Sequence, residues 1–447
     1  MPPVKTWQAG TLTYSSIGIG FLFFWLLWGD FAWSMKERSA GAVAALMLRS
    51  FGTSDMLLGL LMGSLPNAIG MILGPVISYR SDRHRGPRGR RLPYLLVTTP
   101  IAVLGMVGLA LSPWLGRTMQ HFLGTAVIGL DTAILIFFGL SWVTFEFATV
   151  IANAIFIALI NDVVPRGLLG RFFALFRALS LLSGIFFNFY LLGKAEEHYM
   201  WVFIGIAVLY GAGFSIMCLK VKEGEYPPPN DPEHARGFSG AAKLYFQECF
   251  SNRYYCWVFG AYSLCLFAFV PLNTFSLFYA KSLDMSIDFY GKLSALTFVI
   301  SFFLAYLLGI LSDRFHPLRM AIAVIGVYAV VMLLCGILVT GPASFGAAMV
   351  AHGVTAGAFY TATASYGQML FPKARFAQFN SALALLSAIG FTLAPAVIGM
   401  FLDSTGHIYR YTFFMGAGMA ALGMLACMIL YNKFMAMGGP ARYQAPE

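Results

Sequence analysis

The stretch Gly74–Tyr94 reads GPVISYRSDRHRGPRGRRLPY and decides how the rest of the chain is interpreted. It joins two apolar segments, residues 56–79 and 92–111, and carries six arginines but a single acid, Asp82. Such a charge cluster cannot lie in the core of a bilayer, so it predicts a short aqueous hairpin between two membrane-spanning helices. Its positive excess predicts that the hairpin faces the cytoplasm.

The composition of the whole chain agrees with a multi-pass membrane protein. Of its 447 residues, 59% are hydrophobic and only 11% are charged, whereas soluble domains have about a quarter charged residues. The net charge of +10 resides mostly in short loops, as the positive-inside rule expects, so it does not indicate nucleic-acid binding. We expect a plasma (inner) membrane protein whose partners are the lipid bilayer and a small-molecule substrate.

Twelve segments are long and apolar enough to span a membrane as α-helices. The first, residues 14–35, lacks a signal-peptide cleavage site and is interpreted as a retained helix. Residues 36–51 are expected to form outside-facing turns or short interfacial helices, and both termini are expected in the cytoplasm. The other spans are expected at residues 54–79, 92–112, 131–160, 168–193, 199–221, 253–280, 287–311, 318–340, 343–370, 376–402 and 408–434.

The longest polar stretch divides the chain into two halves of six helices. It contains PPPNDPEH, which cannot be helical, and then an amphipathic helix candidate at residues 240–255. The predicted organisation is an N-terminal bundle (1–221), a cytoplasmic linker (222–252) and a C-terminal bundle (253–447).

The two halves repeat one another. Ser81-Asp82-Arg83 after the second helix recurs as Ser312-Asp313-Arg314 after the eighth. Arg171-Phe172 at the start of the fifth helix recurs as Arg375-Phe376 at the start of the eleventh. Parallel repeats of six helices are typical of alternating-access transporters, because two similar halves can rock about a central site. The fold class expected is an all-α membrane protein of two pseudo-symmetric six-helix bundles.

The hairpin and its repeat resemble the loop signature of the major facilitator superfamily. The pattern Ser81-Asp82-Arg83 followed by Gly89-Arg90-Arg91 and Pro93-Tyr94 is similar to that of sucrose–proton symporters and of glycoside–pentoside–hexuronide:cation symporters. The second copy lacks the Gly-Arg-Arg ending, so its match is partial. The resemblance implies a twelve-helix transporter of small polar solutes.

The resemblance also implies a cytoplasmic gate. Asp82 ends a helix, where the helix dipole disfavours an anion, so it needs a partner elsewhere. Family architecture implies a contact with the start of the eleventh helix, near Lys373 and Arg375, and a mirror contact of Asp313 with Arg166 and Arg171. The other gate residues expected are Arg83, Arg90, Arg91 and Arg314. The simpler alternative is that these charges only set topology.

Three ionisable residues inside predicted spans are candidates for cation coupling, namely Asp30, Glu146 and Arg177. Charges within a bilayer are costly and usually functional, and a desolvated carboxylate can exchange protons or ligate sodium. Asp30 also resembles the acid that follows glycine in the first helix of the glycoside–cation symporters. The alternative is a static pair of Glu146 with Arg177.

Other polar and aromatic residues of the predicted helices are candidates for solute binding. Amides could hydrogen-bond sugar hydroxyls, and an aromatic ring could stack on a sugar face. The candidates are Trp28, Asn67, Asn153, Asn273 and His352. A lone histidine is also a common packing residue.

No enzyme signature, phosphate-binding loop or metal-ligand spacing of cysteines occurs, so neither catalysis, ATP nor a metal is expected. The leading interpretation is a monomeric secondary transporter that imports a sugar or glycoside with H⁺ or Na⁺ and needs no cofactor. The alternatives are export, transport of a nucleoside, organic anion or drug, and a non-transporting assembly factor with the same fold.

Overall fold

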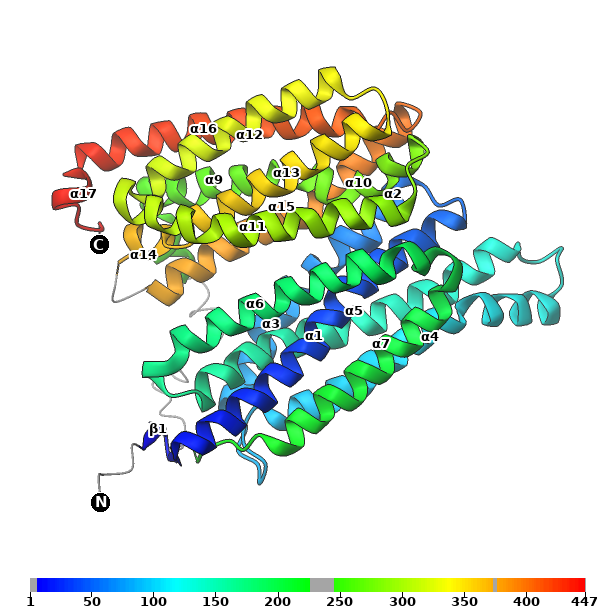
Figure 1. Ribbon diagram of the computed structural model, residues 1–447, viewed down its shortest axis with the longest axis horizontal. Helices are drawn as coiled ribbons and strands as arrows, with labels where there is room; N and C mark the ends of the chain where they lie inside the picture. The colour runs from blue at the N-terminus through cyan, green and yellow to red at the C-terminus, as the bar shows by residue number, and fades with distance from the viewer. Residues whose placement is uncertain (1–5, 226–244, 373–375, 447) are drawn as a thin grey trace. The chain divides into compact units, whose positions relative to one another are not determined.

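The structure is a computed structural model that describes residues 6–225, 245–372 and 376–446, and it is dominated by long helices (Figure 1). Within these ranges the side chains of several residues, including Asp82, Arg83 and Asp313, lie outside the description. A short antiparallel hairpin of β1 (Trp7–Ala9) and β2 (Leu12–Tyr14) precedes the first helix.

The chain folds into two compact units. The first comprises residues 1–54 and 65–229, and the second comprises residues 55–64 and 230–447. Residues 55–64 therefore group with the second unit although α3 follows them directly in the chain. They form α2 (Asp55–Gly59) and a π-helical turn, η1 (Leu60–Ser64).

The first unit is built from long helices. Its elements are α1 (Ser16–Ser50), α3 (Leu65–Arg83), α4 (Leu92–Leu123), α5 (Leu130–Val163), the 3₁₀ turn η2 (Arg166–Leu168), α6 (Leu169–Phe186), the π-helical turn η3 (Phe187–Leu191) and α7 (Leu192–Lys220). Figure 1 shows α1, α4, α5 and α7 running side by side, with α4 packed on α5 and α7, and α1 packed on α6 and α7.

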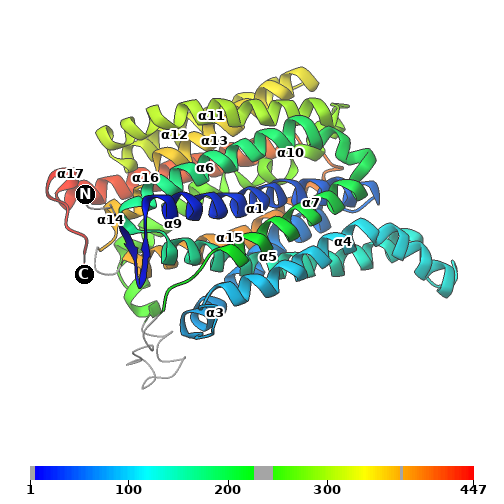
Figure 2. The ribbon, with the colours of Figure 1, turned by 60° about the horizontal axis from the view of Figure 1, so that its bottom comes forward.

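The second unit repeats this packing. Its further elements are α9 (Arg253–Phe267), α10 (Val270–Ser282), α11 (Ile287–Phe315), α12 (Pro317–Leu338), α13 (Pro342–Ala362), α14 (Tyr366–Leu370), α15 (Phe376–Ser404), α16 (Tyr411–Ala436) and α17 (Gly439–Arg442). The pairs α3–α5, α4–α7 and α1–α7 of the first unit correspond in chain order to α11–α13, α12–α16 and α9–α16 (Figure 2). The two halves related by the short repeated motifs therefore also pack corresponding helices against one another.

Ten helical stretches of the described residues are long and apolar enough to cross a membrane. One of them, Arg171–Lys220, has 50 residues. At 1.5 Å per residue it would extend about 75 Å, more than twice the apolar thickness of a bilayer. His198 interrupts it with non-helical dihedral angles (φ −125°, ψ 31°), which divides it into the two spans expected there.

Four expected helix boundaries were wrong. The third helix runs to Leu123 and not to residue 112, and the expected span 343–370 is broken between α13 and α14. The first helix does not end at residue 35 but continues to Ser50, so residues 36–50 are helical and not outside-facing turns. The expected span 253–280 is broken between α9 and α10 at residues 268–269, because Pro271 lacks an N–H and cannot continue the helical hydrogen-bond ladder. Of the amphipathic helix expected at residues 240–255, the part up to 244 lies outside the described residues, and residues 245–250 are helical.

Helices α4 and α5 approach closely at Gly105. A Cβ atom at Gly105 would lie 2.7 Å from the backbone nitrogen of Phe145, so no side chain fits there. Small residues permit such close backbone contact between membrane helices. This contact fixes the position of Phe145 and therefore of Glu146, the next residue on α5.

We predict that Gly105→Val destabilises the first unit by about 1–3 kcal/mol, because α4 and α5 must separate to admit the side chain. Gly139→Ala is the matched control, since a Cβ at Gly139 meets nothing within 4 Å. Denaturant unfolding of the purified protein in mixed micelles measures both. Equal stability of the two variants would contradict the packing argument.

Candidate functional site

Asp30 is a fully buried carboxylate on α1, with 0% of its surface exposed. The hydroxyl of Ser34, one turn later, donates to Asp30 Oδ1 at 3.3 Å. The other oxygen, Oδ2, has no hydrogen-bond partner among the described residues. A buried carboxylate oxygen without a donor is costly unless a proton or a cation occupies it.

Lys36, on the same helix, is also fully buried. Its ammonium lies 3.4 Å from the centroid of the Trp33 indole and donates to Thr149 Oγ1 on α5 at 3.3 Å. The ring centroids of Tyr210 and Phe145 lie 5.1 Å and 5.6 Å from the same nitrogen. A desolvated ammonium over an aromatic face gains about 2 kcal/mol from this contact.

Lys36 was not among the predicted site residues, because the first helix was expected to end one residue earlier. A signal was available, since residues 36–50 contain no proline and only one glycine and can continue the helix. Placing Lys36 on the outer side of the membrane was therefore wrong.

Glu146 lies on α5 and is 9% exposed. Arg177, the partner suggested by the sequence, is exposed on α6, and its charge acts on Arg38. The first unit thus places Lys36 of α1 against Thr149 of α5, the helix that also carries Glu146.

The solute-binding candidates of the first unit lie on three helices. Trp28, on α1, is 38% exposed, and its ring centroid lies 6.2 Å from that of Phe31. Asn67 is half-buried on α3, and Asn153 is exposed on α5. Asn153 lies seven residues after Glu146 on the same helix and, unlike Glu146, is exposed.

Asn273 and His352, two other solute-binding candidates, meet in the second unit. Asn273 is exposed on α10, and its Oδ1 lies 3.1 Å from Nε2 of His352 on α13. The hydroxyl of Tyr328, on α12, lies 2.9 Å from Nδ1 of His352 and 3.3 Å from the carbonyl oxygen of Ala268. That carbonyl belongs to the break between α9 and α10. A polar chain therefore runs from an exposed amide to a buried hydroxyl.

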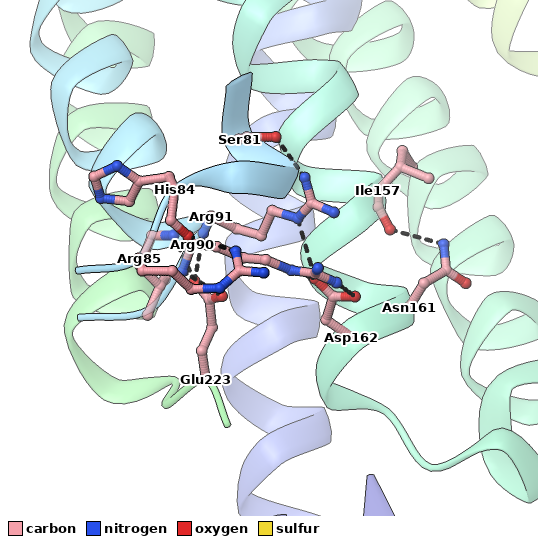
Figure 3. A network of polar contacts seen from close by, with 10 residues as sticks. Ser81, His84, Arg85, Arg90, Arg91, Ile157, Asn161, Asp162 and Glu223 are labelled. Carbon is pink, nitrogen blue, oxygen red and sulfur yellow. Dashed lines mark hydrogen bonds and ion pairs between the residues drawn. The ribbon is translucent and has the colours of Figure 1, made fainter. Parts of the chain in front are cut away.

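The arginine hairpin forms an ion-pair network inside the first unit (Figure 3). Asp162, near the end of α5, accepts hydrogen bonds from Nε and Nη2 of Arg90 at 3.0 Å and 2.6 Å. It also accepts one from Nε of Arg91 at 3.1 Å. Arg91 also donates to the hydroxyl of Ser81 at the end of α3. Charge-assisted pairs of this geometry are among the strongest polar contacts in proteins.

Glu223 fixes the backbone of the same hairpin. Its carboxylate accepts from the backbone N–H groups of Arg90, Arg91 and Leu92 at 2.9, 2.8 and 2.6 Å (Figure 3). These amides lie at the start of α4, where the helix dipole favours an anion. Gly89 has φ +95°, and a Cβ atom there would lie 2.5 Å from the Glu223 carboxyl carbon, so glycine is required. Asp162 and Glu223 were missed because each is distant in sequence from the hairpin.

Several of the predicted gate residues lie outside the part of the chain that the structure describes. The side chains of Asp82, Arg83, Asp313 and Arg166 lie outside the described residues, as do Lys373 and Arg375. Arg171 is exposed at the start of α6. Arg314 is exposed, with its guanidinium carbon 5.5 Å from the centroid of the Phe315 ring.

His316 ends the second hairpin at φ +75° and caps α12. Its Nδ1 accepts the N–H of Leu318 at 3.2 Å. Partial burial and the nearby charge of Arg319 lower the pKa of His316. The ring therefore keeps the neutral form that this capping bond needs.

Two carboxylates and a histidine meet at the ends of α2 and α15 in the second unit. Asp403 accepts the backbone N–H groups of Asp55 and Met56, both at 2.8 Å, and so caps α2. Asp55, which is fully buried, accepts from Nδ1 of His407 at 2.6 Å and from the hydroxyl of Tyr409 at 2.7 Å. One ligand atom each from Asp55, Asp403 and His407 lies within 4.8 Å of the others, so these three could hold a metal ion. In the structure these three residues contact one another through hydrogen bonds and ion pairs.

We predict that Asp162→Asn lowers the free energy of unfolding by about 2–3 kcal/mol, because it leaves two partly buried guanidinium groups without their carboxylate. The exposed pair of Asp288 with Lys292 provides the control, since Asp288→Asn should cost less than about 0.5 kcal/mol. Denaturant unfolding compares the variants. Equal losses would show that the Arg90–Arg91–Asp162 network contributes no more than a surface pair.

Comparisons with known proteins agree with this architecture. The chain resembles a bacterial homolog of the human lysosomal transporter Spinster, with 14% identity, a TM-score of 0.66 and coverage of 96% of this chain and 98% of that one. It also resembles a D-xylose–proton symporter (15% identity, TM-score 0.64, coverage 92% and 97%) and the nucleoside transporter NupG (12%, 0.63, 92% and 99%). No curated protein matches the chain. The sequence model of the family described as MFS/sugar transport protein matches residues 43–406, so the chain belongs to this family of non-enzymatic membrane transporters.

Proposed function

We propose that the protein is a secondary active transporter that imports a sugar or glycoside together with H⁺ or Na⁺. The observation that carries this proposal is Asp30, a carboxylate with no exposed surface and one oxygen that receives no hydrogen bond from the described residues. A protein that served only as a scaffold would have no use for such a costly group. The proposal includes a plasma-membrane location, cytoplasmic termini, a monomeric state and no cofactor.

Cation coupling is assigned to Asp30 and Glu146. Asp30 would take a proton or a sodium ion when the site is open to one side of the membrane and release it on the other side. The bound cation would supply the partner that Asp30 Oδ2 lacks in its own unit. Arg177, which is exposed, is proposed as a nearby charge that adjusts this equilibrium.

Solute binding is assigned to exposed polar and aromatic side chains. Asn273 is supported best, because its amide oxygen is hydrogen-bonded to His352 at 3.1 Å, and His352 is in turn hydrogen-bonded to Tyr328 at 2.9 Å. A fixed amide can distinguish hydroxyl patterns on a sugar ring. Trp28, Asn67 and Asn153 are the further candidates of the first unit.

A nucleoside is the second candidate solute. Its support is the similarity in fold to NupG, named as a nucleoside transporter. Sugars and nucleosides share hydroxylated rings, so the same amide and aromatic groups could bind either.

Uptake into proteoliposomes tests the function. With a panel of radiolabelled sugars, glycosides and nucleosides, we expect accumulation of one class under an inward proton or sodium gradient. Asp30→Asn should reduce this accumulation at least about tenfold and remove its dependence on the gradient, because the amide cannot carry a cation. Asp131→Asn, which changes an exposed acid at the start of α5, is the control. Full gradient-driven uptake by Asp30→Asn would reject the coupling role.

The gate proposal concerns Asp82 and Asp313. Each is proposed to hold the cytoplasmic side shut through contacts with Arg375 and Arg171 respectively, assisted by Arg83, Arg90, Arg91 and Arg314. Asp82→Ala should then increase the labelling rate of single cysteines placed at the cytoplasmic helix ends, because the inward-open population rises. Labelling rates equal to those of the parent protein would assign these charges to topology alone.

A further inference from the structure

Three groups of the second unit form one chain of contacts behind Asn273, which is exposed on α10. Asn273 Oδ1 lies 3.1 Å from Nε2 of His352, and Nδ1 of the same ring lies 2.9 Å from the hydroxyl of Tyr328. Tyr328 donates to the carbonyl oxygen of Ala268 at 3.3 Å. His352 is 6% exposed, and Tyr328 and Ala268 are 0% exposed, so these groups depend on one another for hydrogen bonds.

The direction of these hydrogen bonds is set at the buried end of the chain. Ala268 lies in the break between α9 and α10, where the N–H of Asn273 donates to the carbonyl of Phe269 at 3.0 Å and leaves the carbonyl of Ala268 to Tyr328. A carbonyl oxygen only accepts, and a tyrosine hydroxyl has a single hydrogen, so Tyr328 has none left for His352. The hydroxyl oxygen must therefore accept from Nδ1–H of the ring.

Two states of His352 satisfy every group in this chain. A neutral imidazole has one N–H, and once Nδ1 carries it, Nε2 can only accept. The amide of Asn273 must then turn its NH₂ group toward the ring and its oxygen outward. A ring with both hydrogens also donates from Nε2, which holds the amide oxygen inward, as in the structure, and turns the NH₂ group outward. The other neutral form, Nε2–H, leaves Nδ1 facing a hydroxyl whose hydrogen is in use.

No charged side chain of the described residues contacts the His352 ring, so the neutral state is the resting one. Helix α13, which carries the ring, packs on α10, α11 and α12. Tyr328 is the titratable group that contacts the ring from α12, and Tyr290 of α11 is hydrogen-bonded instead to Ser276 of α10 at 2.9 Å. The charged residues of these three helices lie within two turns of a helix end: Lys281, Asp288, Lys292, Asp313, Arg314 and Arg319.

We propose that the protonation state of His352 sets the hydrogen-bond polarity of Asn273: the neutral ring, in its Nδ1–H form, turns the amide oxygen outward, and the ring with both hydrogens turns the NH₂ group outward. His352 is a positioning residue, because it acts on the solute through Asn273. A hydroxyl both donates and accepts and so pairs with either orientation, whereas an ether or a carbonyl only accepts. The inference rests on the proposed role of Asn273 in solute binding and adds that the solute group at this point is a hydroxyl.

Nitrogen-15 NMR of the purified full chain, labelled at the imidazole nitrogens, tests the ring directly and needs no solute. Ring nitrogens with and without a hydrogen have well-separated chemical shifts, and His352→Gln identifies the signals of His352. At about pH 8, where the ring is neutral, Nδ1 should carry the hydrogen. His316 is the matched control with the opposite tautomer, because its Nδ1 accepts the N–H of Leu318 at 3.2 Å and its hydrogen must lie on Nε2.

Tyr328→Phe should reverse the tautomer of His352. Without the hydroxyl, Nδ1–H has no acceptor, whereas Nε2–H can donate to the amide oxygen of Asn273, so the hydrogen should move to Nε2. The signals of His316 should stay unchanged. Lowering the pH from about 8 to about 4 should add the second hydrogen to the ring of the parent protein.

Monodeoxyfluoro derivatives of the sugar that accumulates in the uptake assay test the consequence for the solute. Fluorine cannot donate a hydrogen bond, so the derivative that lacks the hydroxyl bound by Asn273 should compete about tenfold less well than the parent sugar when the ring is neutral. In Asn273→Ala this difference should disappear. Equal competition by every derivative in the parent protein would overturn the pairing with a hydroxyl.

Three NMR results would overturn the inference and leave the proposed transport intact. They are a neutral ring with its hydrogen on Nε2, a tautomer that Tyr328→Phe does not change, and a ring without a second hydrogen at about pH 4. The first is read from the parent protein and does not depend on the folding of any variant. If the NMR results are as expected but no sugar or nucleoside is taken up, the proposed function is rejected and the two states of His352 stand.

Discussion

A charge removed from water needs a partner, and the polar interior of the first unit follows from this requirement. Helix α1 is the element that creates it, because it carries both Asp30 and Lys36 into the apolar interior. The ammonium of Lys36 lies over aromatic faces and donates to a threonine hydroxyl. Asp30 accepts a hydrogen bond from one serine hydroxyl, and its other oxygen has no donor in the part of the chain that the structure describes. The imbalance between these two residues is the physical basis for assigning cation coupling to Asp30.

The same requirement acts at the polar end of the unit, where the arginine hairpin lies. Water and the positive-inside rule explain why arginines occur there, but they do not explain the ordered contacts. Asp162 holds Arg90 and Arg91, and Glu223 holds the backbone at the start of α4 (Figure 3). The hairpin is therefore fastened to α5 and to the segment after α7 within its own unit. A gate that uses Asp82 would operate beside this fixed network.

In the second unit, the buried polar groups form hydrogen bonds mainly with neutral side chains and with the ends of helices. His352, Tyr328 and Asn273 form a hydrogen-bonded chain at the break between α9 and α10. Asp55, a buried carboxylate of this unit, has donors for both oxygens, and Asp403 caps a helix. No oxygen of these two carboxylates resembles the orphan oxygen of Asp30. This contrast favours cation coupling in the first unit and solute recognition by neutral hydrogen bonds in the second.

The sequence by itself determined the helical membrane fold, the repeat and the position of Asp30 and Glu146 within membrane-spanning helices. These follow from local rules, because about 20 apolar residues must form a helix in a bilayer and a charge within such a run is exceptional. Only the tertiary structure decided which charges meet. The ion pairs of Asp162 with Arg90 and Arg91 and of Asp55 with His407 join residues far apart in the chain, as does the hydrogen bond of Lys36 to Thr149. Pairing of this kind depends on how helices pack against one another, and neither hydropathy nor short motifs predict that packing.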